Sequence, residues 1–138
     1  DDVTGVQTCA LPIWEQFHGL NKDFFTTSAG YGICETQKTA YTKDGDALYS
    51  VMIGGPVKDF DCLPLELAKK TLRAGRYAVF THRGTLGNLY KTYQYIFGTW
   101  LQTTREELDD REDFEVYEHE ILSFDDPDNE VKIFIPIK

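Results

Sequence analysis

The sequence predicts an α+β domain in which a strand–helix–strand–strand unit is duplicated with pseudo-twofold symmetry, giving a mainly antiparallel sheet and two long helices. Two separate segments read as strand, turn and strand, with their turns at residues 43–46 and 125–129. An aromatic-rich segment with helical spacing precedes each of them. The same elements recur in the same order, which is typical of one supersecondary unit used twice. The seam between two such units is a natural place for a pocket.

The first unit is predicted over about residues 14–57. A helix over residues 11–24 is indicated because Trp14, Phe17 and Phe24 fall on one side at helical spacing. Small residues at 26–30 predict a loop. Strands are expected at 31–37 and 47–53, joined by a hairpin turn whose Asp44-Gly45 dipeptide is a strong turn signal.

The segment from residue 55 to about residue 70 is predicted to be a surface linker between the units, with a short helical turn at 65–70. A strand should follow over residues 71–83, because the run Tyr77-Ala78-Val79-Phe80 favours β structure, with a break at Gly75.

The second unit is predicted over about residues 71–138. Its helix should span residues 86–103, since apolar residues recur there in a continuous stripe. The charged run 105–113 is expected to be a solvated loop. Strands are predicted at 114–121 and 130–137, on either side of the acidic turn.

The first thirteen residues are interpreted as a segment that is not native. Residues 3–13 read VTGVQTCALPI, which is a translation of a common sequencing-library adapter. We therefore expect the natural reading frame to begin near Trp14, with its N-terminal stretch lost, and residues 14–138 to form a single domain. Residues 3–9 contain enough β-prone side chains to pair as a substitute strand, but we expect no site residue among them.

Composition restricts the function classes. The formal net charge of −9 disfavours binding to nucleic-acid phosphates and to anionic membranes, and it favours binding to cationic partners. Aromatic residues make up 14% of the chain, a surplus that often lines pockets. The odd count of 3 Cys and the scattered 3 His fit no metal motif, so we predict free thiols, no metal and no cofactor.

Location is predicted from what the sequence contains. No apolar run approaches the roughly 20 residues of a membrane helix, and the start does not resemble a signal peptide. We therefore expect a cytoplasmic protein that contacts neither a membrane nor, directly, nucleic acid.

An ordered set of segments resembles the GyrI-like (gyrase-inhibitor-like) family, which also occurs as the effector-binding domain of AraC-type and multidrug-responsive regulators. The segments that carry the resemblance are 14–17, 31–33, 44–54, 76–84 (RYAVFTHRG), the helix with Tyr93, Ile96 and Trp100, 113–117 and 133–138. It covers nearly everything after residue 13. The family is bacterial and is often fused to a helix-turn-helix domain, and no such domain is present in this chain. The resemblance therefore implies a stand-alone binding protein, and the alternative is that truncation removed a fused domain.

Glu115 is the sharpest candidate site residue. Strand alternation places Glu115, Tyr117 and His119 on one face. The resemblance implies a carboxylate at this position in the floor of an aromatic pocket, where it would suit a lipophilic cation through charge pairing and cation–π contacts. The alternative is an ordinary exposed strand glutamate.

Other candidates surround this position. Tyr117 would hydrogen-bond or stack beside Glu115, and Gly32, the counterpart of Glu115 in the first unit, would leave room opposite it. Aromatic walls are expected from Trp14, Phe17, Tyr49, Tyr93 and Trp100, with core packing as the alternative for each. His82 and His119 are predicted to be surface residues of strands.

The predicted function is binding of hydrophobic, cationic aromatic molecules, by sequestration or sensing. No catalytic constellation is visible. One alternative is a hydrolase of strained electrophilic molecules, with Glu115 as general base. Another is an interaction module that inhibits a topoisomerase. Partners would be the small molecule and either a DNA-binding regulator or a topoisomerase.

Overall fold

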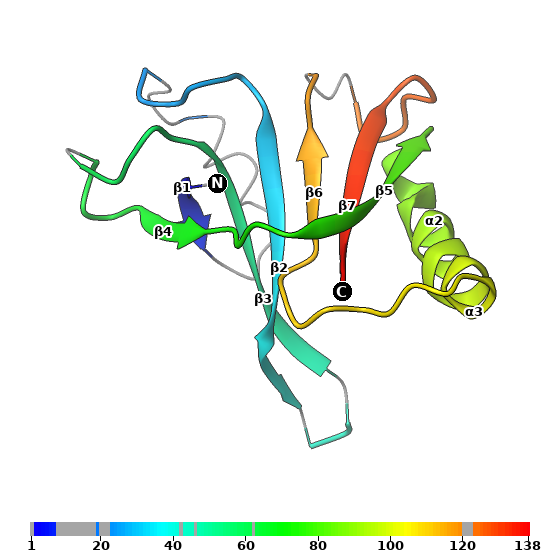
Figure 1. Cartoon of the computed structure of the whole chain (residues 1–138). Coiled ribbons are helices and arrows are strands. Elements are labelled where there is room, and N and C mark those ends of the chain that lie inside the picture. The colour runs from blue at the N-terminus through cyan, green and yellow to red at the C-terminus, as the bar shows by residue number, and fades with distance from the viewer. Residues whose placement is uncertain are drawn as a thin grey trace.

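The fold is α+β, with a seven-stranded sheet in the order β4-β1-β3-β2-β6-β7-β5 and a helix beside β5 and β7 (Figure 1). All pairs of neighbouring strands are antiparallel. The computed structural model describes residues 2–7, 19, 23–41, 43–45, 47–61, 63–119 and 123–138. The predicted fold class and the mainly antiparallel sheet are therefore confirmed.

The first half of the sheet is built around a long hairpin of β2 (Gly30–Tyr41) and β3 (Ala47–Pro56). Gly45 adopts φ 87° in the connecting turn, a left-handed conformation that glycine reaches without steric cost. β2 is longer than predicted, because it continues past a register irregularity between Glu35 and Ala40.

Two short strands extend this half of the sheet. β1 (Asp2–Gln7) pairs with both β3 and β4 (Ala68–Thr71). The pairing expected for residues 3–9 is thus seen as far as Gln7, and residues 8 and 9 lie outside the described residues. The helical turn predicted at 65–70 is wrong, since Ala68–Thr71 is a strand with β1 as its partner.

The second half contains β5 (Arg76–Arg83), β6 (Phe114–Tyr117) and β7 (Glu130–Ile137). Of the strand predicted at 71–83, the part after the expected break at Gly75 is β5, whereas Thr71 is the last residue of β4. β4 and β5 lie on opposite edges of the sheet, so the chain must cross the sheet between them. β7 matches its prediction. β6 ends at Tyr117, earlier than predicted, and residues 120–122 lie outside the described residues.

One long helix is described, and its predicted bounds are confirmed. It comprises a 3-10 turn (Leu86–Asn88), α2 (Leu89–Tyr95), a π-helical turn (Ile96–Trp100) and α3 (Leu101–Thr103). None of the helices in the described ranges is long and apolar enough to cross a membrane. The other predicted helix, at 11–24, lies almost wholly outside the described residues, so the duplication and its symmetry stay predictions.

The two faces of the sheet bury different clusters. On one face Ile33, Met52 and Phe114 pack with Leu72 and Val116. On the other, the helix covers Ile133 and Ile135 of β7 through Ile96, with Phe80 and Trp100 at the margin. The helix covers only this part of its face, and the candidate site lies beside it.

Two predictions about polar residues are wrong. His82 is buried rather than exposed, because its ring lies between the Thr92 hydroxyl (2.7 Å) and the Thr85 carbonyl (3.0 Å). The run 105–113 is not fully solvated: Glu112 is buried and contacts Lys70, and the Arg111 guanidinium donates to the Arg76 and Ile137 carbonyls. His119 is exposed, as predicted.

Candidate functional site

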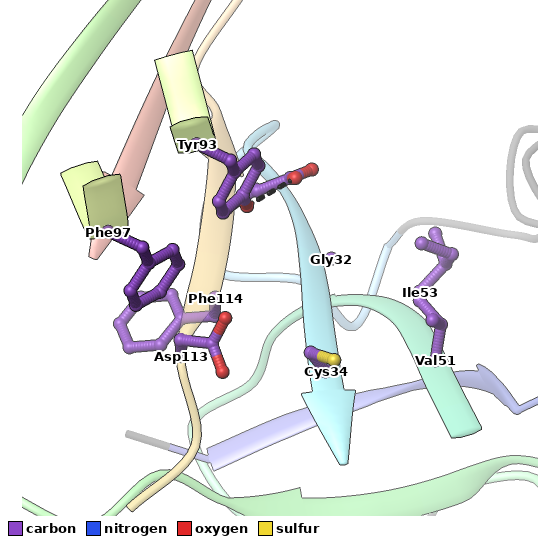
Figure 2. A pocket seen from close by; sticks show the side chains of 9 residues that line it. Gly32, Cys34, Val51, Ile53, Tyr93, Phe97, Asp113 and Phe114 are labelled. Atoms are coloured by element: carbon purple, nitrogen blue, oxygen red, sulfur yellow. Dashed lines mark hydrogen bonds between the residues drawn. The ribbon is translucent and has the colours of Figure 1, made fainter. Parts of the chain in front are cut away.

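A cavity of about 370 Å³ opens on the helix-bearing side of the sheet (Figure 2). Four segments contribute to it: β2, β3, the start of β6 and the long helix. Its lining consists of Gly32, Cys34, Val51, Ile53, Tyr93, Phe97, Asp113, Phe114 and Glu115.

Sheet register explains why these residues meet. Gly32 of β2 is opposite Ile53 of β3 on one side and Glu115 of β6 on the other. One rung further along, Cys34 is opposite Val51, and its amide donates to the Asp113 carbonyl (3.2 Å). Because residues two apart share a face, these two rungs form one continuous floor.

Glu115 is held by two tyrosines. The Tyr93 hydroxyl donates to Oε1 and the Tyr117 hydroxyl donates to Oε2, each at 2.6 Å. Burial, and then the charge of Glu115, raise the pKa of both phenols. The tyrosines therefore stay neutral donors, and their two hydrogen bonds orient the carboxyl group.

Gly32 leaves space in front of Glu115. A Cβ at this position would lie 3.5 Å from Glu115 Oε2 and 3.6 Å from Ile53 Cδ1. Gly32 is not among the described glycines with a positive φ. The significance of glycine here is the missing side chain and not an unusual backbone conformation.

The aromatic wall comes from the helix. Tyr93 and Phe97 are four residues apart and so share a helix face, and their rings are stacked at 6.4 Å with an interplanar angle of 10°. Figure 2 shows them on one side of the floor, with Val51 and Ile53 on the other. Phe97 belongs to the π-helical turn, a feature that is frequent at functional sites.

Two further polar groups lie in the floor, and sequence reasoning did not select them. Burial, followed by the charges of Glu115 and Glu112, raises the pKa of Asp113. Burial and nearby carboxylates raise the pKa of the Cys34 thiol to about 11, so the thiol is protonated near neutral pH. Strand alternation from Gly32 and Glu115 would have found both, as helical spacing from Tyr93 would have found Phe97.

The predicted site residues separate into groups. Glu115, Gly32 and Tyr93 line the cavity together, and Tyr117 is buried next to Glu115, outside the lining. Trp100 is not in the lining: it packs edge-on against Phe80 (4.9 Å) in the core under the helix. Tyr49 lies in β3, and its side chain is not described. Trp14 and Phe17 lie outside the described residues.

The cavity is anionic and apolar. Two carboxylates and a neutral thiol lie among aromatic and aliphatic groups, and the described lining contains no Lys, Arg or His. Within the described ranges, no group of three His, Cys, Asp or Glu side chains is placed to hold a metal ion.

Two comparisons with known proteins show which family this chain belongs to. The chain is 28% identical over 128 residues to the transcriptional regulator BrlR of Pseudomonas aeruginosa, an alignment that covers 91% of this chain and 45% of the regulator. The chain thus spans less than half the length of that relative. Residues 6–137 match the family Cass2, described as integron-associated effector binding protein. Because this match covers most of the chain, the protein belongs to the Cass2 effector-binding family, and the resemblance to GyrI-like proteins is confirmed.

Proposed function

We propose that this protein binds hydrophobic, cationic aromatic molecules in the cavity beside the long helix, and that it acts by sequestering or sensing them. One observation carries the proposal: the Glu115 carboxylate lies in the floor and receives hydrogen bonds from two neutral phenols. The described lining supplies no positive charge to balance it. A ligand cation would supply that charge.

The energetics favour such a ligand. A charge pair at about 4 Å is worth roughly 4 kcal/mol before desolvation at an effective dielectric constant near 20. The rings of Tyr93 and Phe97 add apolar burial and cation–π attraction. The cavity volume of about 370 Å³ lies within the range of about 300–1,000 Å³ that is typical of small-molecule sites.

The family supports a ligand-binding role in general terms, since its description is that of an effector binding protein. The relative is a transcriptional regulator, so sensing on behalf of a DNA-binding regulator is the partnership we favour. The chemical class of the ligand, a cationic aromatic molecule, is inferred from the Glu115 carboxylate and from the rings of Tyr93 and Phe97.

The hydrolase alternative depends on the same carboxylate. As general base, Glu115 would have to take a proton from water, yet both of its oxygens already accept phenol hydrogen bonds. This arrangement fits a fixed counter-charge better than a base. Nothing in the cavity specifically favours a topoisomerase as partner.

The test is calorimetric titration with rhodamine 6G, a hydrophobic monocation. Glu115→Gln keeps the shape of the side chain and removes its charge, so affinity should fall about 10- to 100-fold, which corresponds to about 1.4–2.7 kcal/mol. Glu118→Gln is the matched control, because Glu118 is exposed and its carboxylate pairs with Lys132 at 3.0 Å. The control should bind as the wild type does.

Two outcomes would contradict the proposal. Equal affinity of the wild type and Glu115→Gln would remove Glu115 from the site. In the second experiment, strained electrophiles are incubated with the protein and analysed by mass spectrometry. If they are hydrolysed faster than in buffer alone, and Glu115→Gln abolishes this hydrolysis, the protein is a hydrolase instead.

A further inference from the structure

Asp113 is a second carboxylate in the cavity floor. Glu115 alone would be enough to bind a ligand with one positive charge. It directly precedes β6, two residues before Glu115, and both residues line the cavity. Asp113, Phe97 and Cys34 all line the cavity (Figure 2), and the Cys34 amide donates to the Asp113 carbonyl at 3.2 Å. The cavity therefore contains two acidic positions in a row.

The two carboxylates differ in their partners. Both oxygens of Glu115 are held by phenol donors at 2.6 Å. Asp113 accepts a hydrogen bond from its own backbone amide. The charged groups that affect its pKa are Glu115 and Glu112, and both are negative. Among the described residues, no cationic side chain forms an ion pair with Asp113. A second cation in the cavity would relieve this unfavourable arrangement.

The spacing of the floor matches that of the wall. Residues two apart on a strand are separated by about 6.6 Å along the strand axis. The Tyr93 and Phe97 rings, one helical turn apart, have centroids 6.4 Å from each other. Tyr93 bonds to Glu115, and Phe97 and Asp113 line the same cavity (Figure 2), so the wall offers two rings and the floor two carboxylates.

We propose that Glu115 and Asp113 together form a two-point anionic floor that selects aromatic molecules carrying two positive charges over those carrying one. This inference rests on the proposed function and makes it narrower. The aromatic body lies against Tyr93 and Phe97, the first charge pairs with Glu115, and the second reaches Asp113. Asp113 is then a residue that determines specificity, whereas Glu115 is needed for every cation.

Ethidium and propidium test this directly, because they share one phenanthridinium fluorophore and propidium carries an additional quaternary ammonium group. Fluorescence titration of the wild type should give affinity about tenfold higher for propidium. Asp113→Asn should abolish that preference, with a much larger loss of affinity for propidium than for ethidium. Asp125→Asn, which makes the same charge change at an exposed loop residue, should keep the preference and so corrects for general attraction to an acidic protein.

Failure of the inference is distinguishable from failure of the proposed function. If ethidium binds and Glu115→Gln weakens it, but propidium has no advantage or Asp113→Asn leaves that advantage intact, the two-point floor is wrong and cation binding stands. If rhodamine 6G, ethidium and propidium all fail to bind, the proposed function itself is overturned.

Circular dichroism checks that each variant folds, and Asp113→Ser provides a second neutral replacement. Should neither fold, the wild type is titrated with phenanthridinium derivatives in which the second ammonium stands on progressively longer alkyl chains. An affinity optimum at an intermediate chain length supports the two-point floor. A flat or steadily rising series overturns it.

Discussion

Gly32 and Glu115 stand directly opposite each other on the antiparallel strands β2 and β6, so that the absent side chain of one faces the carboxylate of the other. A Cβ on Gly32 would be 3.5 Å from Glu115 Oε2, which is ordinary van der Waals contact. A methyl group is therefore tolerated at this position, while a longer side chain would occupy the cavity. Space at one residue and charge at its partner together define the candidate site.

Gly32→Leu should block ligand binding without unfolding the protein. The leucine side chain would extend over Glu115 into the space that the ligand uses. Gly32 is not one of the described glycines with a positive φ, so its backbone conformation does not require glycine. We expect rhodamine 6G affinity to fall by about tenfold or more. Calorimetric titration measures the loss, and thermal unfolding measures the retained stability.

Gly98→Leu is the control for that substitution. Gly98 lies on the long helix, and a Cβ there would meet no atom within 4 Å. Leucine favours the helix over glycine by roughly 0.5–1 kcal/mol, so this variant should be at least as stable as the wild type and should bind normally. Normal binding by Gly32→Leu would place the ligand away from Glu115.

Tyr117→Phe should separate support of the carboxylate from contact with the ligand. Tyr117 is buried and is not in the cavity lining, and its hydroxyl donates to Glu115 Oε2 at 2.6 Å. Loss of a hydrogen bond to a charged group should lower the free energy of unfolding by about 1.5–3 kcal/mol. Urea denaturation monitors this change.

Cation affinity of Tyr117→Phe should be retained or increased, because Glu115 keeps its charge and loses one competing donor. Tyr93→Phe is the companion variant, in which the altered ring does line the cavity. A tenfold fall in affinity for Tyr117→Phe alone would show that its hydroxyl, rather than Glu115, contacts the ligand.

Sequence reasoning selected the residues at the centre of the candidate site because local periodicity and family resemblance converge there. Strand alternation placed Glu115 and Tyr117 on one face, and their side chains do interact. Comparison of the two predicted units placed Gly32 at the counterpart position, and the register confirms that it faces Glu115. The helix at 86–103 followed from a continuous apolar stripe, which is the strongest periodic signal in the chain.

The errors concern features that tertiary packing decides. Ala68–Thr71 is a short edge strand that exists because β1 lies beside it, and four residues give too little alternation to predict it. His82 reads as a strand residue facing water, but Thr92 and Thr85, from the following loop and helix, enclose its ring. Charged residues read as solvated when the partner that buries them is distant in sequence, as Glu112 and Lys70 are.

Lys70→Met should be among the most destabilising single substitutions. Its ammonium contacts Glu112 at 2.9 Å and Glu35 at 3.4 Å, and both carboxylates are buried. Removing the cation that these carboxylates share should cost about 3–5 kcal/mol, the scale found when one partner of a buried ion pair is deleted. Chemical denaturation provides the measurement.

Lys138→Met serves as the matched variant, because Lys138 pairs with Glu107 at 3.0 Å between side chains that are 64% and 72% exposed. A surface pair of this kind is worth about 1 kcal/mol or less. Similar small losses for the two lysines would show that the Lys70 cluster is effectively solvated and does not stabilise the junction of β4, β2 and the segment before β6.

Asp113→Asn should stabilise the free protein at neutral pH even though it removes a binding group. The pKa of Asp113 is raised from its ordinary value of 3.8, first by burial and then by the charges of Glu115 and Glu112. A raised carboxyl pKa means that the folded state holds its proton more tightly than the unfolded state does. The resulting contribution to stability is full below the unfolded pKa and is lost as pH rises through the folded pKa.

At pH 7 the charged Asp113 therefore opposes folding, and a neutral asparagine should raise the Tm relative to the wild type. The difference should shrink as pH falls through the raised pKa of folded Asp113, because the carboxyl group then becomes neutral in the folded protein. Asp109→Asn should show the opposite sign, because its hydrogen bond from Arg111 at 2.6 Å lowers the pKa of Asp109. Stability from Asp109 is present above its unfolded pKa and is lost as pH falls through its folded pKa.

Thermal unfolding of both variants between pH 4 and pH 8 tests the pair. A lower Tm for Asp113→Asn across this range would mean that the Asp113 carboxylate supports the fold, whereas a higher Tm together with loss of propidium selectivity would show a charge kept for its ligand at a cost in stability.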